Sequence, residues 1–555
     1  MAGEEPRVAG RKQQKLHGRA FYESIGSPKL VLAPMVQQSE FAWRMLTRSF
    51  MPPSSSPNAL LAYTPMLHSR MFVDTPKYRD AHFQPLKSGA VPSPPDPHRA
   101  SQFGPSELHL DGNPQLDRPL FVQFCSNSPD DLLLAAQHVQ PFCDAVDLNL
   151  GCPQGIARRG HYGAFLQEDW DTIHNLISRL HADLEVPVTA KMRVLETPEK
   201  TLKYAKMILS AGASIITVHG RRREQKGHNT GLADWSMLRY LRENLPRDTV
   251  IFANGNILQH GDIARCLKET GADGVMSAEA NLCDPSIFAG PPPIGEEGRE
   301  YWRATADVGG YRVDAVMRRY LDIVYKHVLQ SPIPPRQPLF IPADKEYLGA
   351  MEPNVSEALD PDERKKRKEP YANSDDADEG TAVKKMRKKQ KKSTDPNLTA
   401  MQAHLFNLLR PLVGTHHDVR DALAKCRAGD MTAFEGVLGM VEARVKEGIL
   451  DYEENSGAVP TLLESYPQPS PTGCESSIAA VQRCKRPWWV CQSYVRPLPK
   501  EALEKGSMTL GKKDKERARL EGEKSEVGSS SNKSSETIGA GETEAESVGQ
   551  NVAHG

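Results

Sequence analysis

The sequence predicts an α/β fold in which a parallel (β/α)8 barrel, or TIM barrel, is followed by an all-α helical domain. Eight short apolar runs recur between residues 28 and 300, and most are followed by apolar residues at helical spacing. Apolar runs that alternate with helices are typical of a parallel sheet covered on both faces. Eight such units in roughly 250 residues match a (β/α)8 barrel. A doubly wound sheet is the competing fold, but its glycine-rich fingerprint after the first strand is absent.

The predicted strands are the apolar runs themselves. In chain order they cover residues 29–36, 59–67, 119–125, 145–151, 186–194, 213–220, 248–256 and 273–280. Helical spacing follows, for example, in the segments 128–139, 199–212 and 260–271. We therefore expect the barrel over residues 28–300, with the Pro- and Ser-rich stretch 74–118 as a long surface loop.

Two further regions, 310–330 and 397–450, carry apolar residues at helical spacing. We expect one helical domain over 301–352 and 396–455 that a charged insertion divides. Two unrelated helical pieces are the alternative interpretation.

The other segments contain fewer signals of folded structure. The insertion and the tail combine dense charge with few large apolar residues, so burial cannot offset the entropy of ordering them. Trp488 and Trp489 are expected to pack a C-terminal segment onto the core, with a base-stacking platform as the alternative. We expect an N-terminal extension at residues 1–27 and a disordered insertion at 353–395. The C-terminal segment is expected at 456–500 and a disordered tail at 501–555.

Charge and cysteine usage restrict the class of protein. There are 70 Lys and Arg against 71 Asp and Glu, a net charge of −1, so affinity for nucleic acid must come from local patches. Nine cysteines without a C-x-x-C pair, after a polar start, predict an intracellular protein with reduced thiols. No run approaches the ~20 apolar residues of a membrane-spanning helix. The spacing of Cys474, Cys484 and Cys491 differs from that of structural zinc sites, so no metal is predicted.

Nearly every predicted strand ends in residues that can hydrogen-bond or carry a charge. In a (β/α)8 barrel, the carboxyl ends of the strands hold the chemistry. One polar residue there is usually structural, because buried polar groups often only satisfy the backbone. The same feature repeated along the barrel predicts a functional rim. In chain order the residues are Met35, Gln37, Gln123, Cys125, Asn149, Cys152, Lys191, Arg193, His219, Arg221, Asn254, Asn256, Ser277 and Glu279.

The ends of the last two strands are candidates for phosphate binding. Barrels commonly bind phosphate through the loops after strands seven and eight. Small residues let backbone N–H groups approach an anion closely. "NGN" is also a common turn sequence, so its place in the barrel carries the prediction. The candidate residues are Asn254, Gly255, Asn256, Ser277 and Ala278.

Three further residues have competing interpretations. Lys191 and His219 could hold an electron-rich ring and stabilise negative charge on it. They could equally be an ion-pair partner on the rim and a satisfied core histidine. Cys152, in the stretch "NLGCPQ", could be a packed side chain, a metal ligand, a disulfide partner, a nucleophile or an acid. The residue types alone leave these alternatives open.

A series of motifs occurs in order along the predicted barrel: "LAPMVQQSEFAWR", "YTPML", "FVQFC", "DLNLGCPQ", "ARRGHYGAFL", "KMR", "TVHGRRREQKG", "ANGNI" and "DGVMSAEANL". Together they resemble the tRNA-dihydrouridine synthases, and most of all the eukaryotic class that acts on uridines 16 and 17 of the D-loop. The resemblance covers about residues 28–290 in detail. It extends less strictly through the two helical regions and to "RPWWVCQSYVRP" at 486–497. The combination of motifs is specific, whereas each tripeptide alone is not.

The resemblance implies an FMN-dependent barrel with a C-terminal helical domain that grips tRNA. It implies that the flavin ring rests on the backbone of Ala33, Pro34 and Met35. Ala278-Glu279 stands where many bacterial relatives carry Gly-Arg, which leaves the role of Glu279 open. The polar edge of the flavin and its phosphate would be held by Gln123, Lys191, His219, Asn254, Gly255, Asn256, Ser277 and Ala278.

The resemblance also implies a reaction, reduction of the 5,6 double bond of uracil. NADPH or NADH reduces FMN, hydride passes to carbon 6, and Cys152 donates a proton to carbon 5. A thiol with a pKa near ~8.5 is mostly protonated at pH 7, which suits this role. Solvated rim charge is the alternative for the arginines beyond the strand ends. The residues implied to hold the base or the RNA are Asn149, Arg158, Arg159, Arg193, Arg221 and Arg223.

Two functions of other classes remain as alternatives. One is a flavin-dependent dehydrogenase of small pyrimidines, and the other is a non-catalytic tRNA-binding protein. The helical appendix and the arginine-rich loops favour a macromolecular substrate over the first. Cys152, Lys191 and His219 argue against the second.

Partners and location follow from the same reasoning. We expect tRNA and NAD(P)H as partners, no membrane, and a monomer in the cytoplasm, the nucleus or both. Residues 364–392 hold 12 Lys and Arg against 5 Asp and Glu, a net charge of +7. The runs 364–368 and 384–392 therefore predict a nuclear import signal or an RNA-binding arm, although such runs are usually only solvated.

Overall fold

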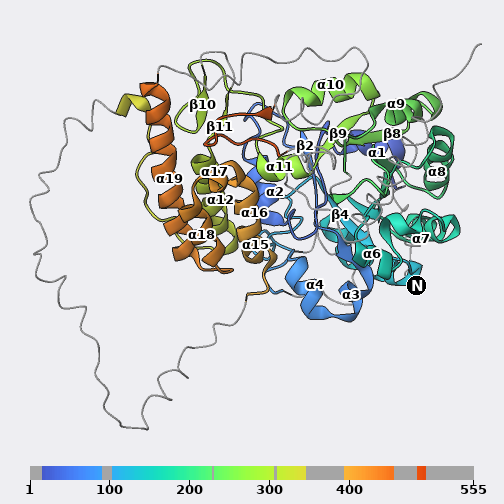
Figure 1. The fold of residues 1–555 in the computed structure, drawn as a ribbon. Helices are drawn as coiled ribbons and strands as arrows, with labels where there is room; N and C mark the ends of the chain where they lie inside the picture. Colours follow the sequence, from blue (N-terminus) through green and yellow to red (C-terminus); the bar gives the residue numbers. More distant parts are fainter. Residues whose placement is uncertain are drawn as a thin grey trace, which may run out of the picture. The chain divides into compact units, whose positions relative to one another are not determined.

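The computed structural model describes residues 15–89, 103–227, 230–304, 309–344, 393–455 and 484–494 (Figure 1). Its main feature is a parallel sheet with the strand order β2-β1-β9-β8-β7-β6-β5-β4-β3. An additional pairing of β2 with β4 closes eight of these strands into a barrel. The predicted (β/α)8 barrel is confirmed.

Each of the eight predicted runs contains one barrel strand. The strands are shorter than the runs, because the residues that follow each strand bend into the loops of the rim. A two-residue strand, β3 (Leu67–His68), pairs with the end of β4. The barrel strands are β1 (Leu30–Leu32), β2 (Leu60–Tyr63), β4 (Leu120–Cys125), β5 (Ala145–Leu150), β6 (Val188–Arg193), β7 (Ile215–His219), β8 (Val250–Asn254) and β9 (Gly274–Ser277).

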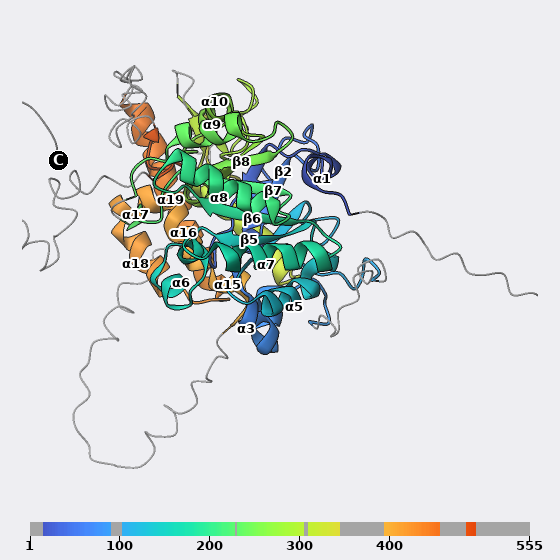
Figure 2. The same cartoon turned by 90° about the vertical axis from the view of Figure 1, so that its right-hand side faces the viewer.

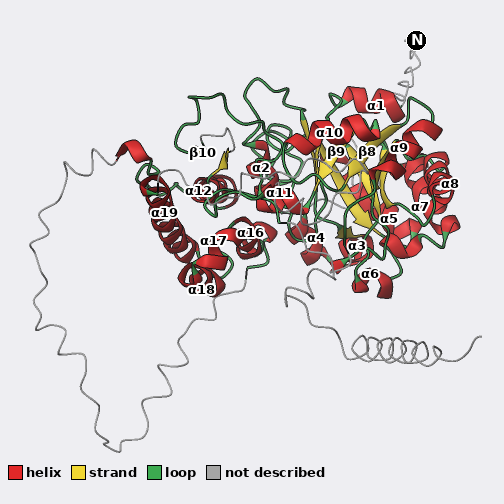
Figure 3. Ribbon diagram, turned by 45° about the horizontal axis from the view of Figure 1, so that its top comes forward, coloured by secondary structure: helices red, strands yellow, loops and turns green. Residues whose placement is uncertain are grey.

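Helices surround these strands, as Figure 3 shows in red around yellow. α7 and α8 lie side by side (Figure 2), where α7 contacts β6 and α8 contacts β7. Several begin at a side-chain cap, since Ser128, Asp169 and Thr197 each accept the N–H of the residue three positions later. The helices of the barrel are α2 (Phe41–Arg48), α3 (Ser69–Asp74), α4 (Pro76–His82), α5 (Pro129–Val139), α6 (Gly155–Arg159), α7 (Trp170–Asp183), α8 (Pro198–Ser210), α9 (Trp235–Asn244), α10 (Gly261–Thr270) and α11 (Glu279–Cys283).

The side chains of each strand alternate between two cores. On β5, Val146 and Leu148 point outward into the core beneath the helices, whereas Ala145 belongs to the core inside the barrel. The inner core is apolar only toward the amino ends of the strands, where Phe121 and Ile215 also lie. Inward positions nearer the carboxyl ends are therefore available for polar groups.

α1 (Gly18–Ser24) closes the amino end of the barrel. Phe21 and Tyr22 are buried in the inner core, and Phe21 stacks on Phe121 with ring centroids 5.9 Å apart. The Tyr22 hydroxyl donates to the backbone oxygen of Asp273 at 3.2 Å. The barrel therefore uses residues that we predicted to be an N-terminal extension.

The stretch 74–118 differs from the predicted long surface loop at both ends. It includes α4, and it returns to the barrel through the buried carboxylates of Asp111 and Asp117. The fully buried guanidinium of Arg44 on α2 donates to both carboxylates, at 2.7 and 2.5 Å. Charges buried this deeply need such pairing, which fixes the loop against α2.

The helices after the barrel pack on each other and on α2. Arg318 of α12 donates to Glu442 of α19 at 3.0 Å, so the two predicted helical regions are in direct contact. A two-stranded hairpin precedes them. The elements are β10 (Tyr301–Arg303), β11 (Gly309–Tyr311), α12 (Val313–Ile323), a π-helical turn at Val324–Val328, α15 (Pro396–Thr399), α16 (Met401–Leu408), α17 (Arg410–Thr415), α18 (His417–Lys425) and α19 (Met431–Glu454).

Segment 484–494 packs against the hairpin and the helices. The indole of Trp489 is buried and lies edge-on to Trp302, with ring centroids 5.8 Å apart. Trp488 lies against Gly448 of α19, where an added Cβ would come within 2.5 Å of the indole. The packing role predicted for both tryptophans agrees with these contacts. The tail 501–555 and most of the insertion 353–395 lie outside the described residues.

Within the described helices, none is both long and apolar enough to span a bilayer.

Candidate active site

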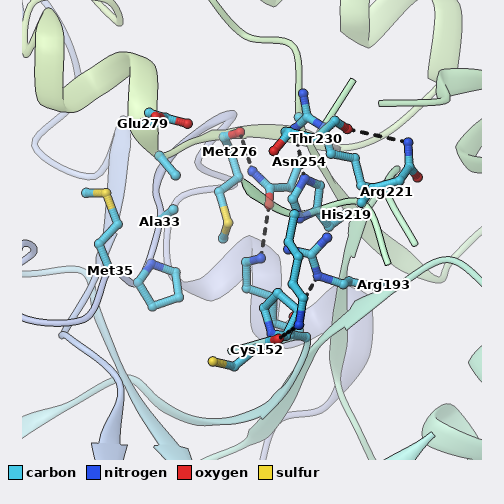
Figure 4. Close-up of a pocket in the computed structure, with 18 of the residues that line it drawn as sticks. Ala33, Met35, Cys152, Arg193, His219, Arg221, Thr230, Asn254, Met276 and Glu279 are labelled. Atoms are coloured by element: carbon cyan, nitrogen blue, oxygen red, sulfur yellow. Dashed lines mark hydrogen bonds between the residues drawn. The ribbon is translucent and has the colours of Figure 1, made fainter. Parts of the chain in front are cut away.

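A cavity of about 860 Å³ opens at the carboxyl end of the barrel (Figure 4). Its volume lies in the range of roughly 300–1,000 Å³ that is usual for ligand and cofactor sites. Figure 4 shows Ala33, Met35 and Glu279 on one side, and His219 and Arg221 on the other. The lining includes these predicted residues: Ala33, Pro34, Met35, Gln123, Asn149, Cys152, Lys191, Arg193, His219, Arg221, Asn254, Gly255, Asn256, Ser277 and Ala278.

Alternation along the strands brings these side chains together. Lys191 lies at the fourth position of β6 and is level with Asn149 of β5 in the strand register. His219 ends β7 and is level with Asn254 of β8. Because Gln123 also falls on the inward face of its strand, these residues form one polar layer above the apolar inner core.

The loop that carries Cys152 is fixed by side chains of β5 and β6. The Asn149 Oδ1 atom accepts the backbone N–H of Cys152 at 2.9 Å and that of Gly151 at 3.1 Å. Arg193 Nε donates to the carbonyl of Gly151 at 2.6 Å. Gly163 has a φ of +65°, and a Cβ there would approach the Cys152 carbonyl to 3.0 Å. The thiol is thereby held at the cavity wall.

The Cys152 thiol is only 9% exposed. Burial raises its pKa above the ordinary thiol value, although Arg193, Lys191 and Lys226 act in the opposite direction. The neutral thiol is therefore the dominant form at physiological pH, and this form carries a proton that it can donate.

Asn149 belongs to a buried hydrogen-bonded chain inside the barrel. Its Nδ2 donates to Gln123 Oε1 at 2.8 Å, and Gln123 Nε2 donates to Asp147 Oδ2 at 2.8 Å. Thr189 donates to the other Asp147 oxygen at 2.6 Å. Burial raises the pKa of Asp147 to about 6, against the hydrogen bonds and the nearby charge of Lys191. Asp147 thus orients the Gln123 amide, and Gln123 orients the Asn149 amide. Asn149 keeps one N–H for a ligand in the cavity.

Sequence reasoning missed Asp147. The available signal was its position two residues before Asn149, which places both side chains on the same face of β5.

Lys191 is a half-buried cation with few partners. Its Nζ atom donates to Asn254 Oδ1 at 3.0 Å, the one side-chain hydrogen bond it makes among the described residues. An ammonium group has three donors, so two remain for a ligand in the cavity. Burial and the neighbouring Arg193 lower the pKa of Lys191 to about 8, although Asp147 opposes the shift. An anionic ligand would restore the charged form.

His219 is held as a neutral imidazole. Burial, with the cations Arg193, Lys191 and Arg221 nearby, lowers its pKa well below the ordinary histidine value. Arg221 Nη1 lies 3.1 Å from His219 Nε2. Because arginine can only donate, Nε2 is the acceptor and the ring proton lies on Nδ1. His219 therefore presents a neutral donor.

Arg221 is turned into the cavity wall. Besides its bond to His219, it donates to Asn256 Oδ1 at 3.0 Å and to the Gly231 carbonyl at 3.1 Å. It lines the cavity beside the predicted phosphate residue Asn256, whereas Glu279, the one carboxylate among the described lining residues, lies on the opposite side. The cavity also contains Lys191, Arg193 and Lys226, so cations outnumber carboxylates and favour an anionic ligand.

The turn after β8 has no room for a side chain. Gly255 has a φ of +115°, and a Cβ there would lie 2.6 Å from Ala233 Cβ and 3.3 Å from the His219 ring. Asn256 follows with a φ of +60°. The turn is thus packed tightly against Ala233 and His219, and both Gly255 and Asn256 line the cavity.

Three predicted arginines lie outside the cavity lining. Arg158 and Arg159 are exposed on α6. Arg223 pairs with Glu168 at 2.7 Å and lies over the Phe165 ring at 5.2 Å. None of the three lines the cavity, although Gly155, which begins α6, does.

The cavity also has lining residues that the sequence did not single out, among them Val36, Met66, Lys226, Leu258 and Tyr494. Within the described residues, no group of three or more His, Cys, Asp or Glu side chains is placed to hold a metal ion.

A closed parallel barrel with a cationic, ligand-sized cavity at the carboxyl ends of its strands is the architecture of (β/α)8-barrel enzymes. The chain belongs to the dihydrouridine synthase family. The model of that family, described as Dihydrouridine synthase (Dus), matches residues 31–306.

Curated relatives extend the similarity beyond the barrel. A Schizosaccharomyces pombe protein named tRNA-dihydrouridine(16/17) synthase, NAD(P)(+), is 38% identical over 488 residues, or 87% of this chain and 92% of that one. A Saccharomyces cerevisiae protein of the same name is 38% identical over 487 residues, covering 87% and 88% of the two chains. A mouse protein named as similar to these synthases is 33% identical over 514 residues, covering 92% and 77%.

Solved structures add no argument. A mandelate oxidase bound to benzoyl-formic acid overlaps 46% of this chain and 65% of its own, with 13% identity and a TM-score of 0.28.

Proposed function

We propose that this protein is a tRNA-dihydrouridine(16/17) synthase, which reduces the 5,6 double bond of D-loop uridines with FMN and NADPH or NADH. The observation that carries the proposal is the meeting of Cys152, Asn149 and Lys191 in one cavity. Family membership and the names of the relatives support the same reaction.

Two features of the cavity fit FMN. The turn at Gly255 and Asn256 is a cradle for a phosphate, with Ser277 and Ala278 on the neighbouring strand end. Lys191 keeps donors for an electron-rich ring. FMN, when bound, supplies the hydride for the base. The residues proposed to hold it are Ala33, Pro34, Met35, Gln123, Lys191, His219, Asn254, Gly255, Asn256, Ser277 and Ala278.

Lys191 and His219 would act on the ring in different ways. The ammonium of Lys191 stabilises negative charge, and the buried site strengthens that interaction. Neutral His219 donates a hydrogen bond from Nδ1 without adding charge. Gln123, oriented by Asp147, presents its remaining N–H to the same ligand.

Cys152 is the proposed general acid. Saturation of uracil adds a hydride at carbon 6 and a proton at carbon 5. The neutral thiol holds that proton at the cavity wall, and Asn149 keeps one N–H for the edge of the base. Arg193, which fixes the same loop, adds positive charge where the base becomes electron-rich.

The target uridine must leave its stack to enter the cavity, which costs less in a loop than in a duplex. Arg158, Arg159 and Arg223 are proposed to hold the RNA from outside the cavity, and Arg221 is proposed to hold it from the cavity wall. The helices of 301–352 and 396–455 are proposed to bind the body of the tRNA. The protein is also proposed to act as a monomer, in the cytoplasm, the nucleus or both.

The test is product formation by purified protein. With NADPH and unmodified tRNA, the wild type should form dihydrouridine at positions 16 and 17. Cys152→Ala should stay yellow and be reduced by NADPH, while product formation falls by a factor of about 10²–10⁴, because the general acid is lost. Cys426→Ala, at a buried thiol of the helical region, is the matched control.

If Cys152→Ala formed dihydrouridine at the wild-type rate, Cys152 would not be the general acid. Turnover of free uridine or orotate at rates matching tRNA would favour the small-molecule dehydrogenase. A colourless protein that binds tRNA would favour the non-catalytic alternative.

A further inference from the structure

An exposed aromatic side chain stands at the mouth of the cavity. Tyr494 is 38% exposed, and it is the one aromatic residue among the large exposed apolar side chains of the described part of the chain. It also lines the cavity, together with Val36, which is 44% exposed. Large apolar groups exposed beside a site usually indicate contact with a ligand or partner.

Tyr494 is held in place by the segment that precedes it. The N–H of Cys491 donates to the Tyr311 carbonyl at 2.9 Å, and the Trp489 carbonyl accepts the N–H of Val313 at 2.9 Å. The Ser493 hydroxyl donates to the carbonyl of Leu258, which itself lines the cavity. The segment that carries the ring is therefore held on both the hairpin side and the barrel side.

A cation covers one face of the ring. The guanidinium carbon of Arg410 lies 4.0 Å from the centroid of Tyr494. Arg410 begins α17 and is itself exposed, so it comes from the helical region and reaches the entrance of the barrel. A stacked arginine preorganises the ring, because it fixes the plane without filling the cavity side.

We infer that Tyr494, supported by Arg410, is a stacking platform for a base of the tRNA that flanks the target uridine. When the target base leaves its stack, a neighbouring base loses a stacking partner. A flat aromatic ring at the mouth replaces that partner for any base, because every base has a π-face. Arg410 adds a positive charge beside the RNA backbone. The inference rests on the proposed function.

Three variants test the platform. Each is compared with wild type for dihydrouridine formation against tRNA concentration, for tRNA Kd, and for the rate at which NADPH reduces the bound flavin without tRNA. Tyr494→Ala should raise the KM and Kd for tRNA by about 5- to 150-fold, the range expected for one stacked base. Tyr494→Phe should stay within about 2-fold of wild type, and Arg410→Ala should weaken binding by about 3-fold or more. Arg179→Ala, an exposed arginine of α7 on the barrel, is the control.

The rate of flavin reduction should not change in any of these variants. A slower reduction with unchanged tRNA binding would make Tyr494 a contact for the nicotinamide nucleotide and overturn the inference. Unchanged KM and Kd in Tyr494→Ala, or equal losses in Tyr494→Phe, would also overturn it.

An altered RNA gives an independent check. An abasic residue next to the target uridine should weaken binding to wild type but cause no further loss in Tyr494→Ala, since both changes remove the same stack. The platform would be contradicted if the abasic residue and Tyr494→Ala weakened tRNA binding additively, whichever side of the target uridine carried the abasic residue. Absence of dihydrouridine from wild-type reactions would instead contradict the proposed function, and tRNA binding would still test Tyr494.

Discussion

Lys191 and Cys152 lie in the same cavity, and burial drives both toward their neutral forms. It lowers the pKa of the lysine to about 8 and raises the pKa of the thiol. For Cys152 this preserves the proton that it is proposed to donate. For Lys191 it makes the charged form costly, and an anionic or electron-rich ligand would add to the compensation that Asp147 and Asn254 already give. The lowered pKa of Lys191 therefore reduces the free energy of unfolding of the ligand-free protein at neutral pH.

The first residue-scale prediction concerns Lys191→Met, which keeps the length of the side chain and removes its charge. The pKa of Lys191 is about 8 when folded and about 10.4 when unfolded. The unfolded state therefore binds more protons between these pH values, so wild-type stability should gain on the order of 2 kcal/mol as pH rises through this window. In Lys191→Met this gain should disappear.

Thermal unfolding of the flavin-free protein between pH 7.5 and 10.5 measures the effect. At pH 7.5 the variant should be at least as stable as wild type, while dihydrouridine formation falls by about 100-fold. A variant that unfolds more easily and keeps full activity would show that Lys191 has a structural role.

At the scale of elements, α16 meets the residue that precedes α2 through a buried hydrogen bond. His404 Nε2 lies 2.9 Å from Glu40 Oε1, and the imidazole stacks on Trp43 with ring centroids 3.9 Å apart. Asn397 accepts the N–H of Ala42 at 2.9 Å beside them. α2 begins six residues after Met35, so this joint connects the helical region to the strand end that lines the cavity.

His404→Ala should destabilise the protein by about 3–5 kcal/mol, because it leaves the Glu40 carboxylate buried without a partner and opens a cavity against Trp43. Urea unfolding measures the loss. Combining it with Glu40→Leu should recover part of the loss, since the unpaired charge is then gone. Equal stability of the single variant and wild type would show that the joint does not hold α16.

The element scale also shows where the sequence misled. Residues 17–25 read as a polar extension, yet Phe21 and Tyr22 of α1 fill the amino end of the barrel. Residues 111–117 read as a loop, yet their carboxylates pair with Arg44. Periodicity detects an apolar face, but it does not detect a short plug or a buried ion pair whose partners are far apart in the chain.

At the scale of the whole molecule, a net charge of −1 conceals an uneven distribution. Cations predominate in the cavity, and exposed arginines lie on α6 near its entrance. The basic runs 364–368 and 384–392, outside the described residues, carry the largest excess of positive charge read from the sequence. Binding of tRNA should therefore depend strongly on salt.

Deleting residues 353–390 should weaken tRNA binding mainly at low salt. It should also reduce the slope of log Kd against log salt by several units, because fewer counterions are released. Fluorescence titration at several salt concentrations measures both quantities, and the flavin reduction rate serves as the control. An unchanged salt slope would contradict a role of the insertion as an RNA-binding arm. An unchanged cellular location of the deletion variant would contradict a role as a nuclear import signal.

The sequence by itself determined the strands, the barrel and the side chains that reach its carboxyl end. These depend on local rules, since alternation along a strand places Gln123, Asn149, Lys191, His219 and Asn254 inward once the strands are known. Only the tertiary structure decided how those side chains are used. It oriented Asn149 toward the Cys152 loop, turned Arg221 onto His219 and Asn256, and brought Arg410 and Tyr494 to the entrance. Such contacts join residues far apart in the chain, and no local pattern of residue types encodes the distance between them.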